Sequence, residues 1–371
     1  MTWEHYKVKF RLLSPLHIGY RKEGNLMRTR RYVPARTLWG ALVANLAQAC
    51  AQESPVDYGT WQGWIGENLR IGYFWPTVLK KSSPCAAHGL DHQAVLFPWE
   101  DPELFDYCFL DSVAATALDP LSHSATEGSL HQVEFISPTT RLGDPVYLLG
   151  DLWIRKPISK PNACKALEKV SSASLPKDLS SPQNFFSLLS RLPLALGGER
   201  TYGWGRVALE EIPANDSPAI NPHGGSTNKA SPLAISPLWC WRVEEVQKEE
   251  DGQKKKDIEV VIFPRDQLGQ ASSAQGKPDG ATECKASPSN VRGVPIPAHV
   301  KVQDLSQDLS YEIFYKIHGN VEPLTAYQYR GKEGFQLIKP PIAFEPGSRL
   351  SGALGFTINC NDGLWIPRKS S

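Results

Sequence analysis

A glycine-rich stretch at residues 196–207 holds the residue types best suited to bind another molecule. It reads Leu-Gly-Gly-Glu-Arg-Thr-Tyr-Gly-Trp-Gly-Arg-Val, with four glycines within nine residues. Glycine lets a bulky partner approach the backbone, arginine offers a planar charged fork for phosphate, and aromatic faces can stack on a base. This combination suits an RNA backbone. The candidate RNA-binding residues of the stretch are Gly197, Gly198, Arg200, Tyr202, Gly203, Trp204, Gly205 and Arg206.

Two other interpretations of the glycine-rich stretch stay open. It can be only a turn with an exposed aromatic residue. A glycine loop can also cradle a nucleotide, but that requires a following helix whose N-terminus faces the phosphates. Residues 206–212 instead read as a strand that stops at Pro213, and no Lys-Ser/Thr pair follows the glycines. The stretch alone therefore favours RNA binding over enzymatic activity.

The most basic part of the chain is residues 20–31. It reads as a loop and contains five basic residues against one acid, Glu23. Most charge runs are solvated, but the whole chain has a net charge of only +1, so a patch this concentrated favours phosphate contacts. The candidates here, with one basic residue that follows shortly after, are Arg21, Lys22, Arg28, Arg30, Arg31 and Arg36.

The other groups that could support chemistry are weaker. The residues whose types suit a zinc site are Cys85, His88 and His92, with Cys108 as a fourth ligand. Their spacing is loose and no second tight pair accompanies them, so we expect an ordinary loop, no metal and no cofactor. Asp144 and Asp151 lie at predicted turns, but neither has a histidine or third acid at a fixed offset, so we assign no catalytic residue.

Predicted strands and helices must position these candidates. Residues 6–12 alternate polar and apolar, which predicts a half-buried strand. The apolar residues of segment 38–46 recur at helical spacing after Thr37, a suitable N-cap. Residues 133–138 and 146–154 read as strands on either side of a turn. The basic stretch therefore lies between a strand and a helix.

The glycine-rich stretch follows a helical pattern within residues 163–190 and an apolar run at 192–196. A second apolar segment, 207–209, comes after it. The simplest local prediction is strand, glycine loop, strand.

Bulk properties limit the class of protein. A length of 371 residues suggests two domains, or one with a large insertion. The near-neutral charge argues against a protein that coats nucleic acid by bulk charge, but allows a local basic groove. Seven scattered cysteines without a Cys-x-x-Cys pair fit a reducing compartment and no disulfide framework. Because no signal pattern begins the sequence and no stretch reaches the ~18 apolar residues of a membrane span, we expect a cytoplasmic protein.

The second half of the chain begins with a change in composition. Residues 213–237 are rich in Pro, Asn, Ser and Gly and read as a linker. Strands predicted at 238–243 and 258–262 surround a charged turn, which indicates a hairpin. The tail, 311–365, is strand-like again and contains two weaker RNA-binding candidates, Tyr329 and Arg330.

Three blocks, taken in order, resemble the RAMP superfamily of CRISPR-associated proteins. The strand ending Pro15-Leu16-His17-Ile18-Gly19 is similar to the family's opening strand. Residues 32–42, Tyr-Val-Pro-Ala-Arg-Thr-Leu-Trp-Gly-Ala-Leu, are similar to its tyrosine-isoleucine-proline-glycine-x-x-leucine-(lysine/arginine)-glycine-alanine segment. Residues 197–206 are similar to its signature glycine-rich loop. The ordered combination is far more specific than any single block.

The resemblance implies an α+β fold of the modified ferredoxin-like (RRM-like) kind, β-α-β-β-α-β, with two such domains in tandem. Residues 1–212 would form the N-terminal domain with the glycine-rich loop. Residues 213–300 would be a linker and flexible insertion with a hairpin, and residues 301–371 the strand-rich part of the second domain. Proteins of this family bind CRISPR RNA (crRNA) in multi-subunit, RNA-guided effectors of antiviral defence.

Residues 343–348 narrow the resemblance within the family. Their sequence, Ala-Phe-Glu-Pro-Gly-Ser, is similar to the alanine-x-x-x-glycine-serine segment of the two-domain type III subunit (III-D or III-A like) that caps the crRNA 5′ handle. The partners that this implies are crRNA, a large polymerase-like subunit and backbone RAMP subunits, with no membrane.

The sequence departs from the family pattern in the second block and in the residues that RNA-cleaving members of the family use. Ala35 and Arg36 stand where the family usually has Gly and Ser, and Trp39 replaces a basic residue. Backbone subunits that cut target RNA carry an aspartate in the loop after the first strand, and residues 20–31 contain none, so we predict no cleavage. His17 lies near the place where processing endonucleases have a histidine, but their glycine loop lies near the C-terminus, which favours a packed or capping histidine.

Two alternatives to a non-catalytic RNA-binding subunit stay open. One is a backbone subunit or processing endoribonuclease that cleaves RNA. The other is a protein-interaction subunit whose glycine-rich stretch contacts neighbouring proteins and no RNA.

Overall fold

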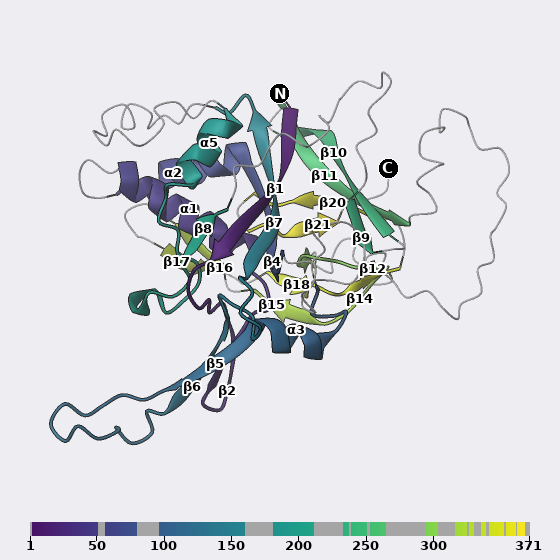
Figure 1. Ribbon diagram of the computed structural model, residues 1–371. Coiled ribbons are helices and arrows are strands. Elements are labelled where there is room, and N and C mark those ends of the chain that lie inside the picture. The colour runs from purple at the N-terminus through teal and green to yellow at the C-terminus, as the bar shows by residue number, and fades with distance from the viewer. Residues whose placement is uncertain are drawn as a thin grey trace, which may run out of the picture. The chain divides into compact units, whose positions relative to one another are not determined.

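The computed structural model describes residues 2–50, 56–79, 96–159, 181–210, 233–236, 239–250, 253–264, 294–302, 316–324, 326–329, 335–338, 341–351, 354–360 and 362–367 (Figure 1). The chain divides into two compact units. The first consists mainly of residues 4–216 and the second mainly of residues 217–359 and 363–371. Both helices and strands are present, so the predicted α+β class is confirmed.

A four-stranded sheet forms the centre of the first unit. Its strands are β1 (Thr2–Leu12), β4 (Leu69–Thr77), β7 (Tyr147–Lys156) and β8 (Val207–Leu209), in the order β4-β7-β1-β8. Between β1 and β4 the chain forms α1 (Ala35–Cys50) and α2 (Tyr58–Asn68), and between β7 and β8 it forms α5 (Pro182–Leu189). This succession and strand order are compatible with a ferredoxin-like, RRM-like arrangement.

Buried and exposed side chains alternate along β1, and the buried ones pack this strand into the core. Val8 and Phe10 are buried, whereas Lys7 between β1's apolar positions is exposed, as the period of two requires. The ring of Phe10 lies 5.6 Å from that of Phe74 on β4, and the ring of Tyr6 lies 5.0 Å from that of Phe186 on α5. The apolar face of β1 therefore packs on both a helix and a side chain from β4, one strand beyond its neighbour β7.

The helix predicted at 38–46 is present as α1 but begins earlier than expected. It starts at Ala35, directly after Pro34, and the Thr37 N–H donates to Pro34 O at 2.9 Å. Thr37 is therefore inside the helix and the prediction that it is the N-cap is wrong. The physical reason is that helical backbone bonding reaches back to Pro34. Arg36 consequently lies in the first helical turn and is half-buried.

Residues 20–31, predicted as a loop, instead supply two strands of a second four-stranded sheet. Its strands are β2 (Gly19–Glu23), β3 (Leu26–Thr29), β5 (Leu110–Ala115) and β6 (His131–Ile136), in the order β2-β3-β6-β5, and α3 (Pro102–Phe109) leads into β5. β2 and β3 form a hairpin around Gly24, which has a φ of 59°. The pair Gly24-Asn25 is a hairpin-turn signal. It is easily overlooked because the residues around it are charged and lack the apolar alternation of a predicted strand.

The described elements of the second unit are all strands. The bounds are β9 (Leu233–Ser236), β10 (Trp239–Glu250), β11 (Gln253–Pro264), β12 (Val294–Pro295), β13 (Val300–Lys301), β14 (Ile317–His318), β15 (Val321–Pro323), β16 (Ala326–Tyr329), β17 (Phe335–Ile338), β18 (Ile342–Phe344), β19 (Arg349–Leu350), β20 (Leu354–Ile358) and β21 (Trp365–Pro367). Strands β10 and β11 pair antiparallel where the sequence predicts a hairpin. They belong to an eight-stranded sheet, β15-β18-β13-β21-β20-β11-β10-β9. A second ferredoxin-like domain stays a prediction.

A half-buried carboxylate in the first unit leads to a prediction about pH. Asp151 on β7 accepts a hydrogen bond from His5 on β1, with 2.8 Å between Nε2 and Oδ1. Burial tends to raise the pKa of Asp151, but the hydrogen bond and charge of His5, together with Lys7, outweigh it and hold the pKa below its usual value. Such a carboxylate stabilises the fold above its unfolded pKa of about 3.9, and the contribution is lost as the pH falls through the folded pKa.

We therefore expect Asp151→Asn to lower the urea midpoint at about pH 6, and the difference from the wild type to shrink toward about pH 2. Urea titrations followed by circular dichroism across this range measure the difference. A deficit that stays constant across the range would show that Asp151 acts through packing and not through its charge.

Candidate nucleic-acid interface

Two segments of the chain hydrogen-bond to residues 14–19, just after β1. The Gly198 N–H donates to His17 O at 2.8 Å, and the Gly205 N–H donates to Pro15 O at 2.7 Å. On the other side, the Arg30 N–H donates to Ile18 O at 2.7 Å. The glycine-rich stretch and the basic hairpin β2–β3 are therefore both hydrogen-bonded to the same short segment.

The glycines of the stretch divide into two kinds. Gly197 and Gly205 have φ angles of 74° and 75°, and a Cβ added to either would overlap a backbone oxygen, that of His17 and that of Leu196 respectively. Gly203 also has a positive φ, 81°, but a Cβ there would meet nothing nearby. The prediction that all the glycines give a partner access to the backbone needs correction, because Gly197 and Gly205 allow close packing of the chain on itself.

The apolar run 192–196 is not a regular strand. It has an isolated bridge between Ala195 and Arg206, and after it the chain forms a short 3-10 turn, η1 (Arg200–Tyr202). The predicted sequence of strand, glycine loop and strand is therefore confirmed only for its last member, β8. The positive φ angles around the turn prevent an extended hairpin.

Two arginines and a tyrosine of the glycine-rich stretch extend into solvent. Arg200 and Arg206 are exposed, and Tyr202 is 78% exposed. Trp204 differs, because it is half-buried and its ring lies 5.1 Å from that of Phe135 on β6 in an edge-on arrangement. The two arginines and the tyrosine ring are thus available to a partner. Trp204 instead packs the stretch against β6.

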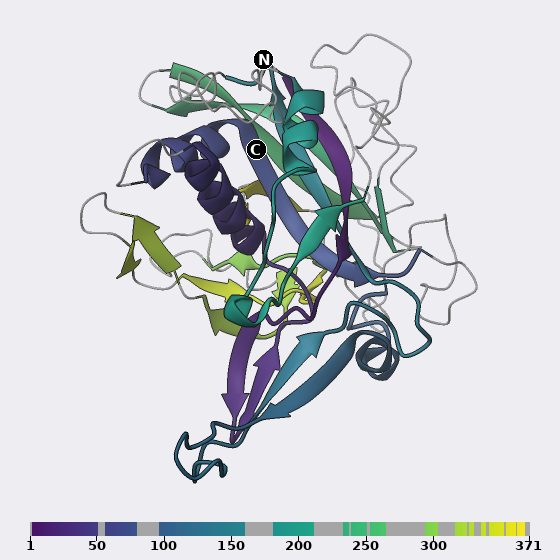
Figure 2. The ribbon, with the colours of Figure 1, turned by 60° about the vertical axis from the view of Figure 1, so that its left-hand side comes forward.

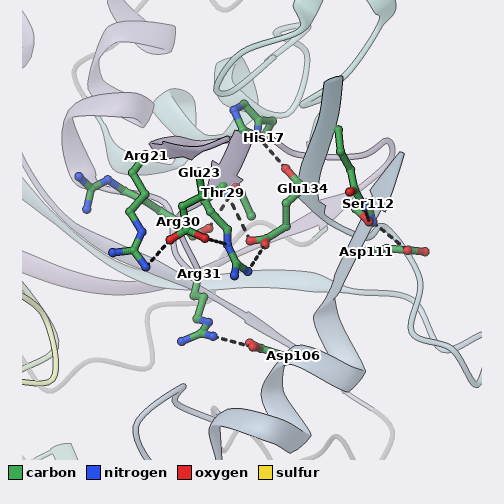
Figure 3. A network of polar contacts seen from close by, with 12 residues as sticks. His17, Arg21, Glu23, Thr29, Arg30, Arg31, Asp106, Asp111, Ser112 and Glu134 are labelled. Atoms are coloured by element: carbon green, nitrogen blue, oxygen red, sulfur yellow. Dashed lines mark hydrogen bonds and ion pairs between the residues drawn. The ribbon is translucent and has the colours of Figure 1, made fainter. Parts of the chain in front are cut away.

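The basic hairpin β2–β3 carries internal ion pairs (Figure 3). Arg21, with a side chain 60% exposed, lies 2.6 Å from Glu23. Arg28 lies 3.0 Å from Glu23 and 2.7 Å from Glu134 on β6, measured between side-chain N and O atoms. The hydrogen bond from Arg28 and the charges of both arginines lower the pKa of Glu23. Exposed pairs of this kind are weak, so Arg21 and neighbouring Lys22 stay accessible to an anion.

Arg30 and Arg31 have structural roles that require no RNA. Arg30 is buried, its guanidinium carbon lies 4.9 Å from the centre of the Tyr20 ring, and it donates to the Tyr32 hydroxyl at 2.9 Å. Arg31 donates to Asp106 on α3 at 2.5 Å. Of the basic stretch, Arg21 and Lys22 are therefore the side chains best placed to contact phosphate.

Glu134 is a positioning residue that the sequence patterns missed. It is 8% exposed, binds Arg28, and accepts from the Thr29 N–H at 3.3 Å, while its backbone oxygen accepts from His17 Nδ1 at 2.7 Å. The only signal in the sequence is a charged residue inside the apolar strand 133–136. His17 is buried and hydrogen-bonded, so the expected packed role is confirmed.

The remaining candidates lie elsewhere. Arg36 is on α1, and Tyr329 is the last residue of β16, which pairs with β17. Arg330, Cys85, His88 and His92 fall outside the described residues.

Neither a zinc site nor a membrane span is found in the described part of the chain. Cys108 is disulfide-bonded, which contradicts both its role as a zinc ligand and the expectation that the cysteines are free. Within the described ranges, no group of three His, Cys, Asp or Glu side chains is arranged to hold a metal ion. None of the helices described has the length and apolar character that crossing a membrane requires.

Comparison with known proteins finds no matching family model, and no curated protein matches the chain significantly. Among solved structures, a chain of the type III-B Cmr-beta complex bound to cognate target RNA and AMPPnP is 8% identical, with a TM-score of 0.37 over 93% of this chain and 85% of that one. A chain of the complex bound to cognate target RNA is 13% identical, with a TM-score of 0.33 over 56% and 97%. A chain of its apo state is 12% identical, with a TM-score of 0.31 over 56% and 98%. At these low scores the likeness alone assigns neither a fold nor a function.

Proposed function

We propose that this chain is a non-catalytic crRNA-binding subunit of a type III CRISPR effector and that it holds the 5′ handle of the guide RNA. The observation that carries the proposal is that the glycine-rich stretch and the basic hairpin both hydrogen-bond to residues 14–19. The glycine-rich stretch hydrogen-bonds to Pro15 and His17, and the basic hairpin that leads into the second block hydrogen-bonds to Ile18. The first and third of the blocks that resemble one family in sequence are therefore in direct contact.

The exposed side chains of this region suit single-stranded RNA. Arg200 and Arg206 supply charged donors for phosphate oxygens, and Tyr202 supplies a face for a base. Arg21 and Lys22 extend the positive charge along β2. On a chain whose net charge is +1, this local concentration favours a short, defined RNA segment over general nucleic-acid binding.

The absence of cutting activity is part of the proposal. A general base must be free to accept a proton from the attacking group. Glu23, the one acid between Tyr20 and Arg31, lies in ion pairs with Arg21 and Arg28. His17 is buried, with Nδ1 bonded to the Glu134 backbone. Neither residue is presented as a base to the exposed region.

Purification of the full chain from the cells that make it tests the proposal. We expect short RNAs that share a repeat-derived 5′ end, a large polymerase-like subunit and backbone subunits to co-purify, and no shortening of labelled RNA during incubation with Mg²⁺. RNA sequencing, mass spectrometry and gel analysis measure these three outcomes.

Each alternative predicts a different result. RNA shortening that is lost in Glu23→Gln or His17→Ala, with binding retained, would establish a nuclease. Recovery of one protein partner without RNA would make the glycine-rich stretch a protein contact. The same purification from cells without the tagged chain is the control for adventitious RNA.

A further inference from the structure

The β5–β6 part of the second sheet extends into an arm, defined here as residues 110–136. Its loop, residues 116–130, lies beyond the ends of β5 and β6 in both views (Figures 1 and 2). Three large apolar side chains of this loop are exposed: Leu118 at 65%, Leu121 at 92% and Leu130 at 59%. Val113 on β5 is also exposed. Single exposed leucines are normal, but three in one short loop indicate a contact surface.

The loop of the arm is ordered without an apolar core of its own. The Asp119 carboxylate accepts from the Leu121 N–H at 2.9 Å and from the Ser122 N–H at 2.8 Å. Across the loop, the Thr126 N–H donates to Ala117 O at 2.9 Å. Polar bonds thus hold the backbone while the leucines face solvent. A loop organised in this way loses little conformational entropy when it binds.

The charges of the arm select the class of partner. Residues 101–140 contain no lysine or arginine, and the arm carries the acids Asp111, Asp119 and Glu127 at its accessible positions. Binding of nucleic acid depends on neutralising phosphates with cations, so a phosphate backbone is repelled here. The strand order is β2-β3-β6-β5, so the basic residues of this sheet, on β2 and β3, lie in the half that ends at the opposite edge. One edge is therefore basic and the opposite edge acidic and apolar.

We infer that the arm docks into an apolar groove of a neighbouring protein subunit whose rim carries lysine or arginine. Leu121 and its neighbours would enter the groove, and Glu127 would face the basic rim. Among the strands that the structure describes, β5 lies at the edge of its sheet, and its outer edge can pair with an extended segment of the same partner. The inference does not depend on RNA binding by the glycine-rich stretch.

Photo-crosslinking in the full complex tests this inference. Leu121 is replaced by a photoreactive benzoylphenylalanine in the full chain, which is expressed in its own cells and purified after irradiation. We expect crosslinked peptides to cluster in one segment of one co-purifying subunit, with apolar residues beside a lysine or arginine. Leu121→Ser combined with Leu118→Ser should lower recovery of that subunit at least fivefold. The matched control is Leu142→Ser, an exposed leucine outside the arm, which should leave recovery unchanged.

A charge exchange makes the test specific. Glu127→Lys should lower recovery of the same subunit, and replacing the crosslinked basic residue of the partner by glutamate should restore it. Crosslinks to RNA, crosslinks to a second copy of this chain, or unchanged recovery with the leucine variants would each overturn the inference. The two proposals fail separately, because the leucine variants should keep bound RNA, whereas loss of Arg200 and Arg206 should leave the crosslink intact.

Discussion

Gly205→Ala lowers the free energy of unfolding of the first unit by about 2–5 kcal/mol. The φ angle of Gly205 is 75°, and a non-glycine residue in this left-handed region costs about 1–2 kcal/mol. The new Cβ would also overlap the backbone oxygen of Leu196, and relieving such an overlap adds about 1–3 kcal/mol. The overlap cannot be relieved by a rotamer change, since the obstructing atom belongs to the backbone.

Gly203→Ala is the matched control for this prediction. Its φ angle, 81°, is nearly the same, but an added Cβ would meet no atom. We expect only the conformational cost of about 1–2 kcal/mol. Urea unfolding of the full chain, followed by tryptophan fluorescence and circular dichroism, measures both variants. Equal losses in the two variants would mean that Gly205 is not packed against the Leu196 carbonyl as described.

The two glycine variants also distinguish an effect on the fold from an effect on RNA binding. Gly205 connects the stretch to Pro15 through its N–H and to Leu196 through its carbonyl oxygen. A distorted Gly205 should therefore displace Arg206, the next residue, and weaken RNA binding along with stability. Gly203→Ala tests whether RNA itself approaches that backbone, because its fold should survive the change.

What the sequence can predict depends on whether the signal is local. The alternation along β1 and the helical spacing in α1 are short-range patterns, and both elements are present. The contact between Arg28 and Glu134 joins residues 106 positions apart, and no periodicity encodes such a pair. Gly205 and Gly203 are indistinguishable in the sequence, since their roles differ only through the carbonyl that lies beside one of them.

The basic hairpin shows why a strand made of charged residues is not predicted from the sequence. Strand β2 is exposed along its whole length, so it lacks the apolar alternation by which half-buried strands are predicted. Its charge density identifies the region as a candidate interface, yet charge alone does not distinguish Arg21, which is exposed, from Arg30, which is buried between tyrosine rings. Only the fold separates the arginines available to RNA from those that support the hairpin.

Reversing both exposed arginines of the glycine-rich stretch, with Arg200→Glu and Arg206→Glu, should weaken RNA binding about a hundredfold or more at low salt. A hydrogen bond to a charged group contributes about 1.5–3 kcal/mol, and each 1.4 kcal/mol corresponds to about a tenfold change in Kd. Both side chains are exposed and lie outside the core, so the fold should persist. Fluorescence anisotropy with the co-purified RNA sequence measures the Kd.

The salt dependence of that binding decides between phosphate contact and a general field effect. Each phosphate contact to a single strand contributes about 0.7 to the slope of log K against log salt, so loss of two should reduce the slope by about 1.4. Arg191→Glu, an exposed arginine outside the stretch, changes the net charge without removing a proposed contact, and its slope should stay at the wild-type value. If Arg191→Glu weakened binding as much per charge as the double variant, the attraction would come from the protein's overall field, and the glycine-rich stretch would lose its place as the RNA site.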